Sequence, residues 1–386
     1  MQNMVKSRKG GESMKYIFYN KNTPVFSFEM YHGKVLKILE NFNPEFRPFQ
    51  VKFNKKQNKI DKSSFEAFLK GRRIPDTRQD KERLLDRLGG KSLYELSLAY
   101  YGLSLSDQYW VKQKGDTAVW KDINFFQNEF SEDMGLFMFG ENNNSSFSLK
   151  TPNNTSEGWL KKAWMIEDGR RVLVKGSSEP YFQEAYNEKI AYEIAKELGI
   201  NHIKYEVKNI GGKPCSVCEN FINENTELVP VSSIIKNGQK PNHMSMYEFV
   251  ISELEKLGIM DSRNRINEML YLDYVIFNED RHFNNFGFIR NVKSLKVQGM
   301  APIYDSGTSL FYNTLDSAIL SSDPDMKPFY KKRQRQYNLI KNSIDINVDV
   351  DKIQKIIIKN LSGSDYLEKF APNRKNIIAE KVEKSI

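Results

Sequence analysis

The spacing of hydrophobic and polar positions changes along the chain and divides it into three parts. Residues 15–55 carry short apolar runs, which predict strands around a small helix. Residues 62–105 carry apolar positions at helical spacing. We assign residues 1–110 to an N-terminal α+β extension whose role the sequence does not indicate. We expect residues 1–13 to be disordered, as chain termini often are.

Residues 111–222 are predicted to form an antiparallel sheet with one helix packed on it. Asp168–Gly169 separates two apolar runs and predicts a hairpin turn. The stretch "EAYNEKIAYEIAKELGI" carries apolar residues at intervals of 3.6 and ends at Gly199, which is typical of a helix. The strands expected around this helix are "FSLKTP", "GWLKKAWMIE", "RRVLVKG", "HIKYEVKNI" and "KPCSVCENFI".

Residues 223–386 are mainly helical by the same criterion. A sheet-rich part followed by a helix-rich part predicts a bilobal α+β fold, with a sheet-rich N-lobe at 111–222 and a helical C-lobe at 223–386. Ligands often bind in the cleft between such lobes. The helices expected in the C-lobe are "MSMYEFVISELEKLG", "RINEMLYLDYVIF" and "VDKIQKIIIKNL", with short strands at "FGFIRN" and "APIYD".

Composition narrows the class of protein without identifying it. Of the 386 residues, 39% are hydrophobic and 28% are charged, which is typical of a soluble globular protein. No window approaches the run of about 18 apolar residues that a membrane helix needs. No apolar core of a signal peptide follows the basic N-terminus. We therefore expect a cytoplasmic protein without a membrane span, and secretion as an effector stays open.

Charge and cysteine content restrict the partners further. The net charge of +9 permits acidic partners such as nucleic acid, nucleotides or anionic lipid. The densest basic clusters, "VKSRKGG" near the N-terminus and "KKRQRQ" at 331–336, are more typical of a solvated surface than of a binding site. Cys215 and Cys218 form one C-x-x-C without a second pair, so we predict two cysteines packed in a strand and no zinc site.

The strongest chemical signal lies in "NEDRHFNNFGF" and in the later "PIYDSGTSL". Asp280 is followed five residues later by Asn285, and Asp305 follows an apolar strand with Gly307 close behind. This order and spacing are typical of the catalytic and metal-binding loops of a kinase. Asparagine and aspartate supply the hard oxygen ligands that Mg²⁺ requires, and a carboxylate orients the acceptor hydroxyl. We therefore predict Asp280 at the acceptor and Asn285 and Asp305 at Mg²⁺, with Asn284 as the alternative to Asn285.

Two titratable residues follow Asp280 directly. We expect His282 to order the loop by hydrogen bonding rather than to bind a metal, because no partner histidine lies nearby in sequence. Arg281 could pair with an acidic side chain or contact phosphate. The sequence does not decide between these two roles.

The sheet-rich part carries candidate contacts for ATP. Lys175 lies near the end of "RRVLVKG", and Glu188 lies on the following helix, on the face that leans toward the sheet. Such a pair can hold the lysine against the α- and β-phosphates of ATP, although the pair alone is a weak signal. The strand that carries Val217, Cys218 and Glu219 precedes the crossover between the lobes. Its backbone is therefore expected to face the adenine edge.

The turn before "GWLKK" is a further candidate. Gly158 and its neighbours could offer backbone N–H groups to phosphate, although the turn lacks the G-x-G-x-x-G pattern. The hydroxyls of Thr155 and Ser156 would then lie near the γ-phosphate. Both residues are therefore candidates for self-phosphorylation, and Ser156 and Gly158 are candidates for ATP binding.

The motifs together resemble those of the HipA-like serine/threonine kinases of bacteria, with the compact CtkA-type branch as the nearest variety. The resemblance covers about residues 145–345 and is most specific in D-R-H-x-x-N and Y-D-x-G. It implies a protein-kinase-like bilobal fold. It also implies a protein that autophosphorylates in the loop at 155–158. The front third does not resemble the amino-terminal domain of full-length HipA toxins, which leaves an antitoxin partner open. The roles implied are catalysis by Asp280, Mg²⁺ binding by Asn285 and Asp305, ATP anchoring by Lys175 and support of that lysine by Glu188.

Two alternatives remain beside an ATP- and Mg²⁺-dependent protein kinase that acts on a protein substrate and on itself. D-R-H-x-x-N is shared with the phosphatidylinositol 3- and 4-kinases, which look related in structure, so a lipid kinase is the enzymatic alternative. The positive charge would suit an anionic membrane. The non-enzymatic alternative is a nucleic-acid-binding regulator that uses the basic segments, although no helix-turn-helix pattern supports it.

Overall fold

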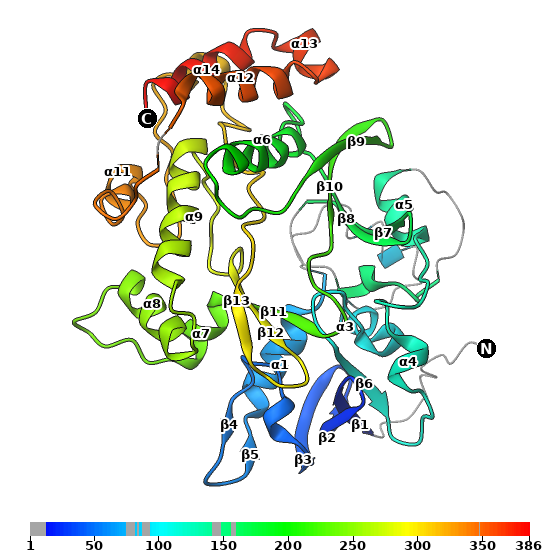
Figure 1. Ribbon diagram of the computed structural model, residues 1–386. Helices are drawn as coiled ribbons and strands as arrows, with labels where there is room; N and C mark the ends of the chain where they lie inside the picture. Colours follow the sequence, from blue (N-terminus) through cyan, green and yellow to red (C-terminus); the bar gives the residue numbers. More distant parts are fainter. Residues whose placement is uncertain are drawn as a thin grey trace.

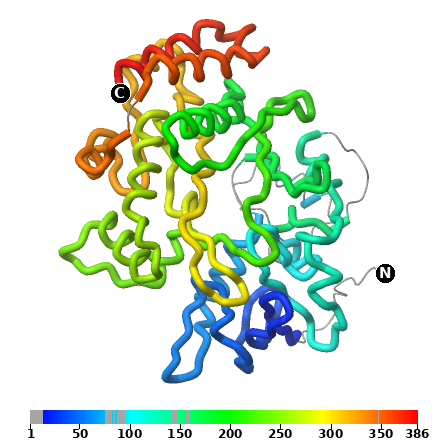
Figure 2. The backbone as a smooth tube through the Cα atoms, in the orientation of Figure 1, coloured from blue at the N-terminus to red at the C-terminus, as the bar shows by residue number. Residues whose placement is uncertain are grey.

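The computed structural model describes residues 13–74, 82, 85–86, 93–140, 148–155, 160–346 and 348–386. Within these ranges the chain has the expected α+β organisation, with two four-stranded sheets, one three-stranded sheet and a helix-rich C-terminal half (Figure 1). Figure 2 follows the chain from the front sheet in blue, through the second sheet in green, to the last helices in orange and red. The disorder expected for the N-terminus falls on residues outside the described ranges, apart from Ser13.

The front sheet has the strand order β3-β2-β1-β6. Helix α1 packs on it because Phe65 and Phe68 place their rings edge-on to Phe18, and Asp61 caps this helix by accepting from the N–H of Ser64 at 2.7 Å. The elements of this part are β1 (Met14–Asn20), β2 (Thr23–Tyr31), β3 (Lys34–Asn41), η1 (Pro44–Phe46), β4 (Phe53–Asn54), β5 (Lys59–Ile60), α1 (Lys62–Gly71), α3 (Leu93–Ser97), η2 (Ala99–Gly102) and β6 (Tyr109–Gln113).

Two expectations for the front third need correction. The small helix expected within residues 15–55 is a single 3-10 turn, η1, and the apolar run before it forms strand β3. The register of β3 against β2 shifts twice, so its apolar residues do not follow a simple alternation. Strand β6 pairs with β1 and therefore carries the front sheet beyond residue 110, where the sequence had suggested a boundary.

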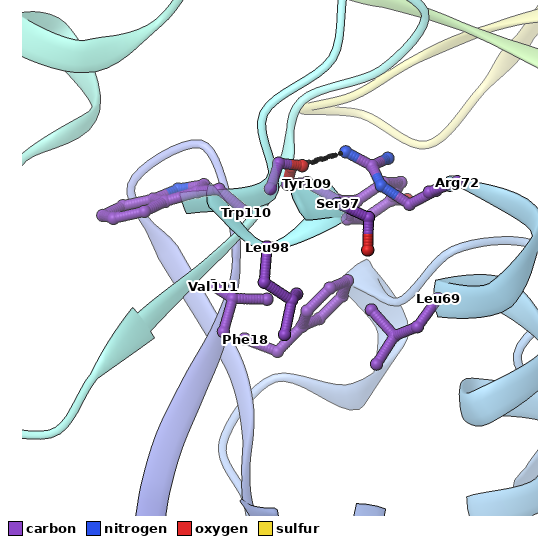
Figure 3. A pocket seen from close by; sticks show the side chains of 9 residues that line it. Phe18, Leu69, Arg72, Ser97, Leu98, Tyr109, Trp110 and Val111 are labelled. Atoms are coloured by element: carbon purple, nitrogen blue, oxygen red, sulfur yellow. Dashed lines mark hydrogen bonds between the residues drawn. The ribbon is translucent and has the colours of Figure 1, made fainter. Parts of the chain in front are cut away.

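A small cavity lies inside the front part, between β1, β6 and α1 (Figure 3). Its lining is mainly apolar and includes Phe18, Leu69 and Val111. At its edge the Arg72 guanidinium donates to the backbone oxygen of Tyr109 at 3.2 Å. None of the candidate site residues lines this cavity, so it belongs to the packing of the front part.

The second sheet has the strand order β7-β8-β10-β9, all neighbours antiparallel, and helices cover both of its faces. Asp168 and Gly169 form the predicted hairpin turn with positive φ angles of 48° and 76°. Cys215 and Val217 face a core that includes Phe139 of α5, whereas Lys175 on β8 faces α6. The elements are α4 (Trp120–Ile123), α5 (Asp133–Phe139), η3 (Pro152–Thr155), β7 (Lys162–Glu167), β8 (Arg170–Gly176), α6 (Glu184–Glu197), β9 (Glu206–Ile210) and β10 (Lys213–Glu219).

The strand expected at "FSLKTP" is not formed where the structure describes this segment. Residues 148–150 are irregular, and the 3-10 turn η3 follows them. The Asn153 side chain explains the difference, because it accepts from the N–H of Trp164 at 2.7 Å and donates to the oxygen of Trp164 at 3.3 Å. A side chain thus takes the place of a neighbouring strand at the edge of β7.

The C-terminal part is built around α9, which is buried along most of its length. Around it lie the other helices and a sheet of order β11-β12-β13. The "APIYD" segment forms one parallel bridge, between Ile303 and His202, instead of a strand. The elements are β11 (Thr226–Pro230), α7 (Val231–Asn237), α8 (Met246–Lys256), α9 (Ser262–Ile276), β12 (Gly287–Asn291), β13 (Val297–Met300), α10 (Asp316–Ile319), α11 (Arg333–Tyr337), α12 (Val350–Leu361), α13 (Asp365–Phe370) and α14 (Arg374–Glu383).

The front part is attached to the segment that joins the second sheet to the helical part. The buried amide of Gln108 donates to the backbone oxygens of Asn223 at 2.8 Å and Thr226 at 2.5 Å. The Asn220 amide donates to the oxygen of Leu105 at 2.9 Å. These bonds fix the front part against the connection between the lobes.

None of the helices in the described ranges is both long and apolar enough to cross a membrane.

Candidate functional site

The loop that carries Asp280 begins directly after the buried helix α9. Phe277 ends the helix in the left-handed conformation, with φ of 54°. The Asp280 carboxylate is 40% exposed and accepts from the Lys327 ammonium at 2.6 Å, while the His282 ring nitrogen lies 3.9 Å from its other oxygen. The buried Asn285 donates its amide N–H to the backbone oxygen of Asp280 at 3.0 Å, whereas Asn284 is exposed. This bond fixes the side chain of Asn285 and leaves its amide oxygen as the candidate metal ligand.

Arg281 is fully buried and joins two loops. Its guanidinium forms an ion pair with Asp273 of α9 through two bonds of 2.9 Å. It also donates to the backbone oxygens of Asn285, at 3.0 Å, and Tyr304, and to the Ser306 hydroxyl at 2.9 Å. Burial alone would lower the pKa of this guanidinium, but the Asp273 carboxylate raises it above its usual value. Of the two roles left open by the sequence, the structure shows the pairing with an acidic side chain.

Lys175 lies between two carboxylates. Its ammonium is 2.9 Å from Glu188 Oε1 and 2.7 Å from Asp305 Oδ1, and it also contacts the Tyr205 hydroxyl at 3.3 Å. The other oxygen of Glu188 accepts from the N–H of Ser306 at 2.8 Å, so Glu188 links the strand lysine to the loop after Asp305. The ion pair between Lys175 and Glu188 that the sequence suggested is therefore present.

The charges of this cluster reinforce one another. Burial lowers the pKa of the Lys175 ammonium, but Asp305 and Glu188 outweigh that effect and hold its pKa well above the usual value. Burial raises the pKa of Asp305, but Lys175 and then Lys162 outweigh it and keep the carboxylate ionised. Asp305 also has a positive φ of 61°, a conformation that few non-glycine residues adopt. An ionised carboxylate on strained backbone beside a buried lysine is typical of a functional site.

Lys162 also lies at this cluster, although no motif in the sequence indicates it. It lies on β7 directly opposite Lys175 on β8, so both side chains point to the same face of the sheet. It is close enough to Asp305 to lower the pKa of that carboxylate. The pairing of β7 with β8 places Lys162 opposite Lys175, and the sequence alone does not show which residues of the two strands pair.

His202 supports the loop from below. Its Nδ1 lies 2.7 Å from the Ile203 oxygen and its Nε2 lies 3.2 Å from the Ser306 hydroxyl, which also accepts from Arg281. Burial lowers the pKa of this imidazole from 6.5 to about 3. His202 is therefore neutral in the folded protein at neutral pH.

The neutral His202 predicts a specific dependence of stability on pH. The unfolded chain takes up a proton near pH 6.5 and the folded one near pH 3, so this contribution is complete above pH 6.5 and is lost as the pH falls. Between pH 6.5 and pH 3, the free energy of unfolding should fall by about 1.4 kcal/mol for each pH unit. Between pH 6.5 and 5, denaturant unfolding should show the wild type losing about 2 kcal/mol more than His202→Gln. Equal losses in both proteins would show that His202 does not titrate this way.

The strand residues proposed to face adenine divide between the two faces of β10. Val217 lies in the core with α5, Cys218 is buried near Lys175, and Glu219 is exposed. Burial raises the pKa of the Cys218 thiol to about 11, which keeps it protonated. Strand β9 pairs with β10 only as far as Val217. Beyond Val217, the edge of β10 that faces away from β8 has no ladder partner among the described strands. Both cysteines are buried in strand β10, as the sequence predicted, and they do not form a disulfide.

The turn that carries the self-phosphorylation candidates is described only in part. The Thr155 hydroxyl is buried and donates to the backbone oxygens of Leu103 at 2.8 Å and Pro152 at 3.1 Å. A hydroxyl held in this way cannot reach a phosphoryl group without rearrangement of the turn. Ser156 and Gly158 lie outside the described residues.

Comparison with known proteins identifies the class of fold. The model of the family described as the HipA-like C-terminal domain matches residues 150–363, more than half of the chain. No curated protein matches the sequence. The structure of HipA from Shewanella oneidensis MR-1, a toxin–antitoxin complex with HipB and operator DNA, superposes with a TM-score of 0.52 at 11% identity, over 96% of this chain and 97% of that chain. The proinflammatory kinase CtkA of Helicobacter pylori gives a TM-score of 0.45 at 18% identity, over 58% of this chain and 89% of that chain.

The family match and the superposition on the Shewanella protein confirm the expected kinase-like fold. The superposition on the Shewanella protein extends over nearly the whole chain. It therefore includes the front third, whose sequence had suggested no likeness to the amino-terminal domain of full-length HipA proteins.

Proposed function

The chain belongs to the HipA-like family, and from this premise we propose that it is an ATP- and Mg²⁺-dependent kinase that phosphorylates serine or threonine of a protein, its own chain included. One arrangement carries the proposal. Lys175 of the second sheet contacts Glu188 and Asp305, while the buried Arg281 joins the loop of Asp280 to the segment around Asp305. ATP between the two lobes would meet Lys175, Asp305 and Asp280. The division into an N-lobe and a C-lobe near residue 222 is part of this proposal.

The donor set fits Mg²⁺. Asp305 offers an ionised carboxylate and Asn285 offers an amide oxygen, both hard donors. No group of three or more His, Cys, Asp or Glu in the described part of the chain could hold a metal by itself. Mg²⁺ usually binds through one or two protein oxygens together with substrate phosphates, and Asn285 and Asp305 would supply two. When bound, Mg²⁺ would neutralise charge on the β- and γ-phosphates.

Each protein group has a role in the proposed transfer. Lys175 donates to a phosphate oxygen, and Glu188 holds it in place. The acceptor hydroxyl oxygen forms a bond to the γ-phosphorus while the bond from that phosphorus to the bridging oxygen of ADP breaks. Asp280 orients the hydroxyl and accepts its proton. Arg281 keeps Asp280 and Asp305 at a fixed separation because it bonds to both loops.

Three finer assignments accompany this proposal. The adenine edge would contact the edge of β10 that faces away from β8, at Cys218 and Glu219, where β9 no longer pairs with it. Ser156 is preferred over Thr155 as the self-phosphorylated residue because the Thr155 hydroxyl is buried. We also propose an antitoxin-type partner. The Shewanella protein was solved in complex with HipB, and its superposition spans the front third of this chain.

Label transfer from [γ-³²P]ATP tests the proposed function. The purified full chain with Mg²⁺ should incorporate label that mass spectrometry locates on serine or threonine, and EDTA should abolish it. Phosphoinositide vesicles added to the same reaction should remain unlabelled. Label in the lipid, or no label in any acceptor, would overturn the assignment as a protein kinase.

A further inference from the structure

The turn at residues 326–331 brings a lysine to the proposed catalytic aspartate. Lys327 Nζ lies 2.6 Å from Asp280 Oδ1, although 47 positions separate the two residues in sequence. We infer that Lys327 is a further catalytic residue, which holds the Asp280 carboxylate and contacts the transferred phosphoryl group. This inference rests on the proposed kinase function. No motif in the sequence points to Lys327.

The turn is held rigidly by a buried side chain. Gln336 of α11 is 1% exposed, and its amide donates to the backbone oxygen of Lys327 at 2.7 Å. The same amide accepts from the N–H groups of Phe329 at 3.1 Å and Tyr330 at 3.2 Å. One buried glutamine therefore fixes the backbone on both sides of the turn. The backbone that carries Lys327 is therefore in place before any substrate arrives, which favours a catalytic charge at this position.

The turn also packs directly on the catalytic loop. The ring of Phe329 is 5.7 Å from the ring of Phe283, three residues after Asp280, in an edge-on arrangement. It lies 5.3 Å from the ring of Tyr247 of α8, also edge-on. The aromatic contact and the ion pair together hold the turn against the loop of Asp280. The backbone of the turn at Lys327 therefore cannot shift without disturbing packed rings.

Stability does not explain this ion pair. The Lys327 side chain is 54% exposed and Asp280 is 40% exposed, and exposed pairs of this kind contribute little to folding. A cation that is half exposed beside the acceptor carboxylate can instead reach a bound phosphoryl group. The ring nitrogen of His282 lies 3.9 Å from the other carboxylate oxygen of Asp280.

The transfer reaction provides a use for this charge. Negative charge spreads over the equatorial oxygens of the γ-phosphoryl group in the transition state. Lys175 and Mg²⁺ would act near the ADP side, and Lys327 would act on the acceptor side. As the hydroxyl–phosphorus bond forms and the bond to ADP breaks, the hydroxyl proton passes to Asp280. The Lys327 ammonium keeps its proton and stabilises negative charge on the carboxylate oxygens of Asp280 and on the oxygens of the phosphoryl group.

Three variants test the inference: Lys327→Ala, Lys327→Arg and the control Lys331→Ala. Lys331 is exposed, lies at the other end of the same turn, and makes no ion pair with the described residues. The rate constant of self-phosphorylation at saturating ATP should fall by about 10- to 1,000-fold in Lys327→Ala. The apparent KM for ATP and the unfolding midpoint should stay near the wild-type values. Lys327→Arg should recover part of the rate, and Lys331→Ala should match the wild type.

The outcomes separate this inference from the proposed function. If the wild type incorporates no label, the kinase assignment itself fails. If the wild type is active and Lys327→Ala is equally fast, only the inference about Lys327 is overturned. A change confined to KM would also overturn it, because it would show ATP binding rather than action in the transfer step. A shifted unfolding midpoint with no recovery in Lys327→Arg would identify a structural residue and count against the inference.

Discussion

Replacing Asp280 by asparagine should reduce phosphate transfer by about 10²- to 10⁴-fold, because asparagine cannot accept the proton of the acceptor hydroxyl. The change keeps the shape of the side chain. It removes one half-exposed ion pair, so the free energy of unfolding should change by less than about 1 kcal/mol. Label incorporation and denaturant unfolding on the same preparation measure both quantities.

Asp168→Asn is the matched control for that experiment. Asp168 is 93% exposed at the hairpin between β7 and β8, and its left-handed conformation accepts asparagine well. The control should transfer phosphate at the wild-type rate. Asp280→Asn at that same rate would contradict the assignment of Asp280 as the catalytic carboxylate.

Replacing Arg281 by alanine should destabilise the fold by about 3–5 kcal/mol and abolish transfer, because it leaves the Asp273 carboxylate buried without a positive charge beside it. The backbone oxygens of Asn285 and Tyr304 would lose their donor as well. Urea unfolding should show the loss as a lower midpoint. Removing Asp273 together with Arg281 should cost less than the two single changes added, since neither charge is then left alone.

Arg265→Ala provides the comparison on the same helix. Arg265 pairs with Asp261 and Glu268 on the surface of α9, and its side chain is 43% exposed. Its removal should cost less than about 1 kcal/mol. An Arg281→Ala protein that unfolds at the same urea concentration as Arg265→Ala would show that the buried network does not hold the two loops together.

The elements with strong periodicity were predictable from the sequence. Helix α6 follows its 3.6-residue pattern from Glu184 to Glu197, and the hairpin at Asp168–Gly169 forms where the turn residues indicated it. The segment "FSLKTP" was predicted wrongly because the Asn153 side chain replaces a strand at the edge of β7. Propensity describes a residue and its neighbours in sequence, whereas this bond depends on a strand eleven positions away.

The same distinction applies to the boundary of the front part. Strand β6 has ordinary strand composition, and nothing local shows which sheet it will join. Its pairing with β1, about ninety positions earlier, assigns it to the front sheet. The bonds from Gln108 to the connection between the lobes are likewise formed across more than a hundred positions.

The sequence alone determined the residues whose relation is local. Asp280 and Asn285 share one short loop, so their spacing is a chemical pattern before any folding occurs. Only the tertiary structure decided which of Asn284 and Asn285 is buried and where Arg281 finds its partner. It also decided that Lys162, His202 and Lys327 reach this site. The reason is that contacts between distant segments depend on how whole strands and helices pack, and that packing leaves no periodic trace in the sequence.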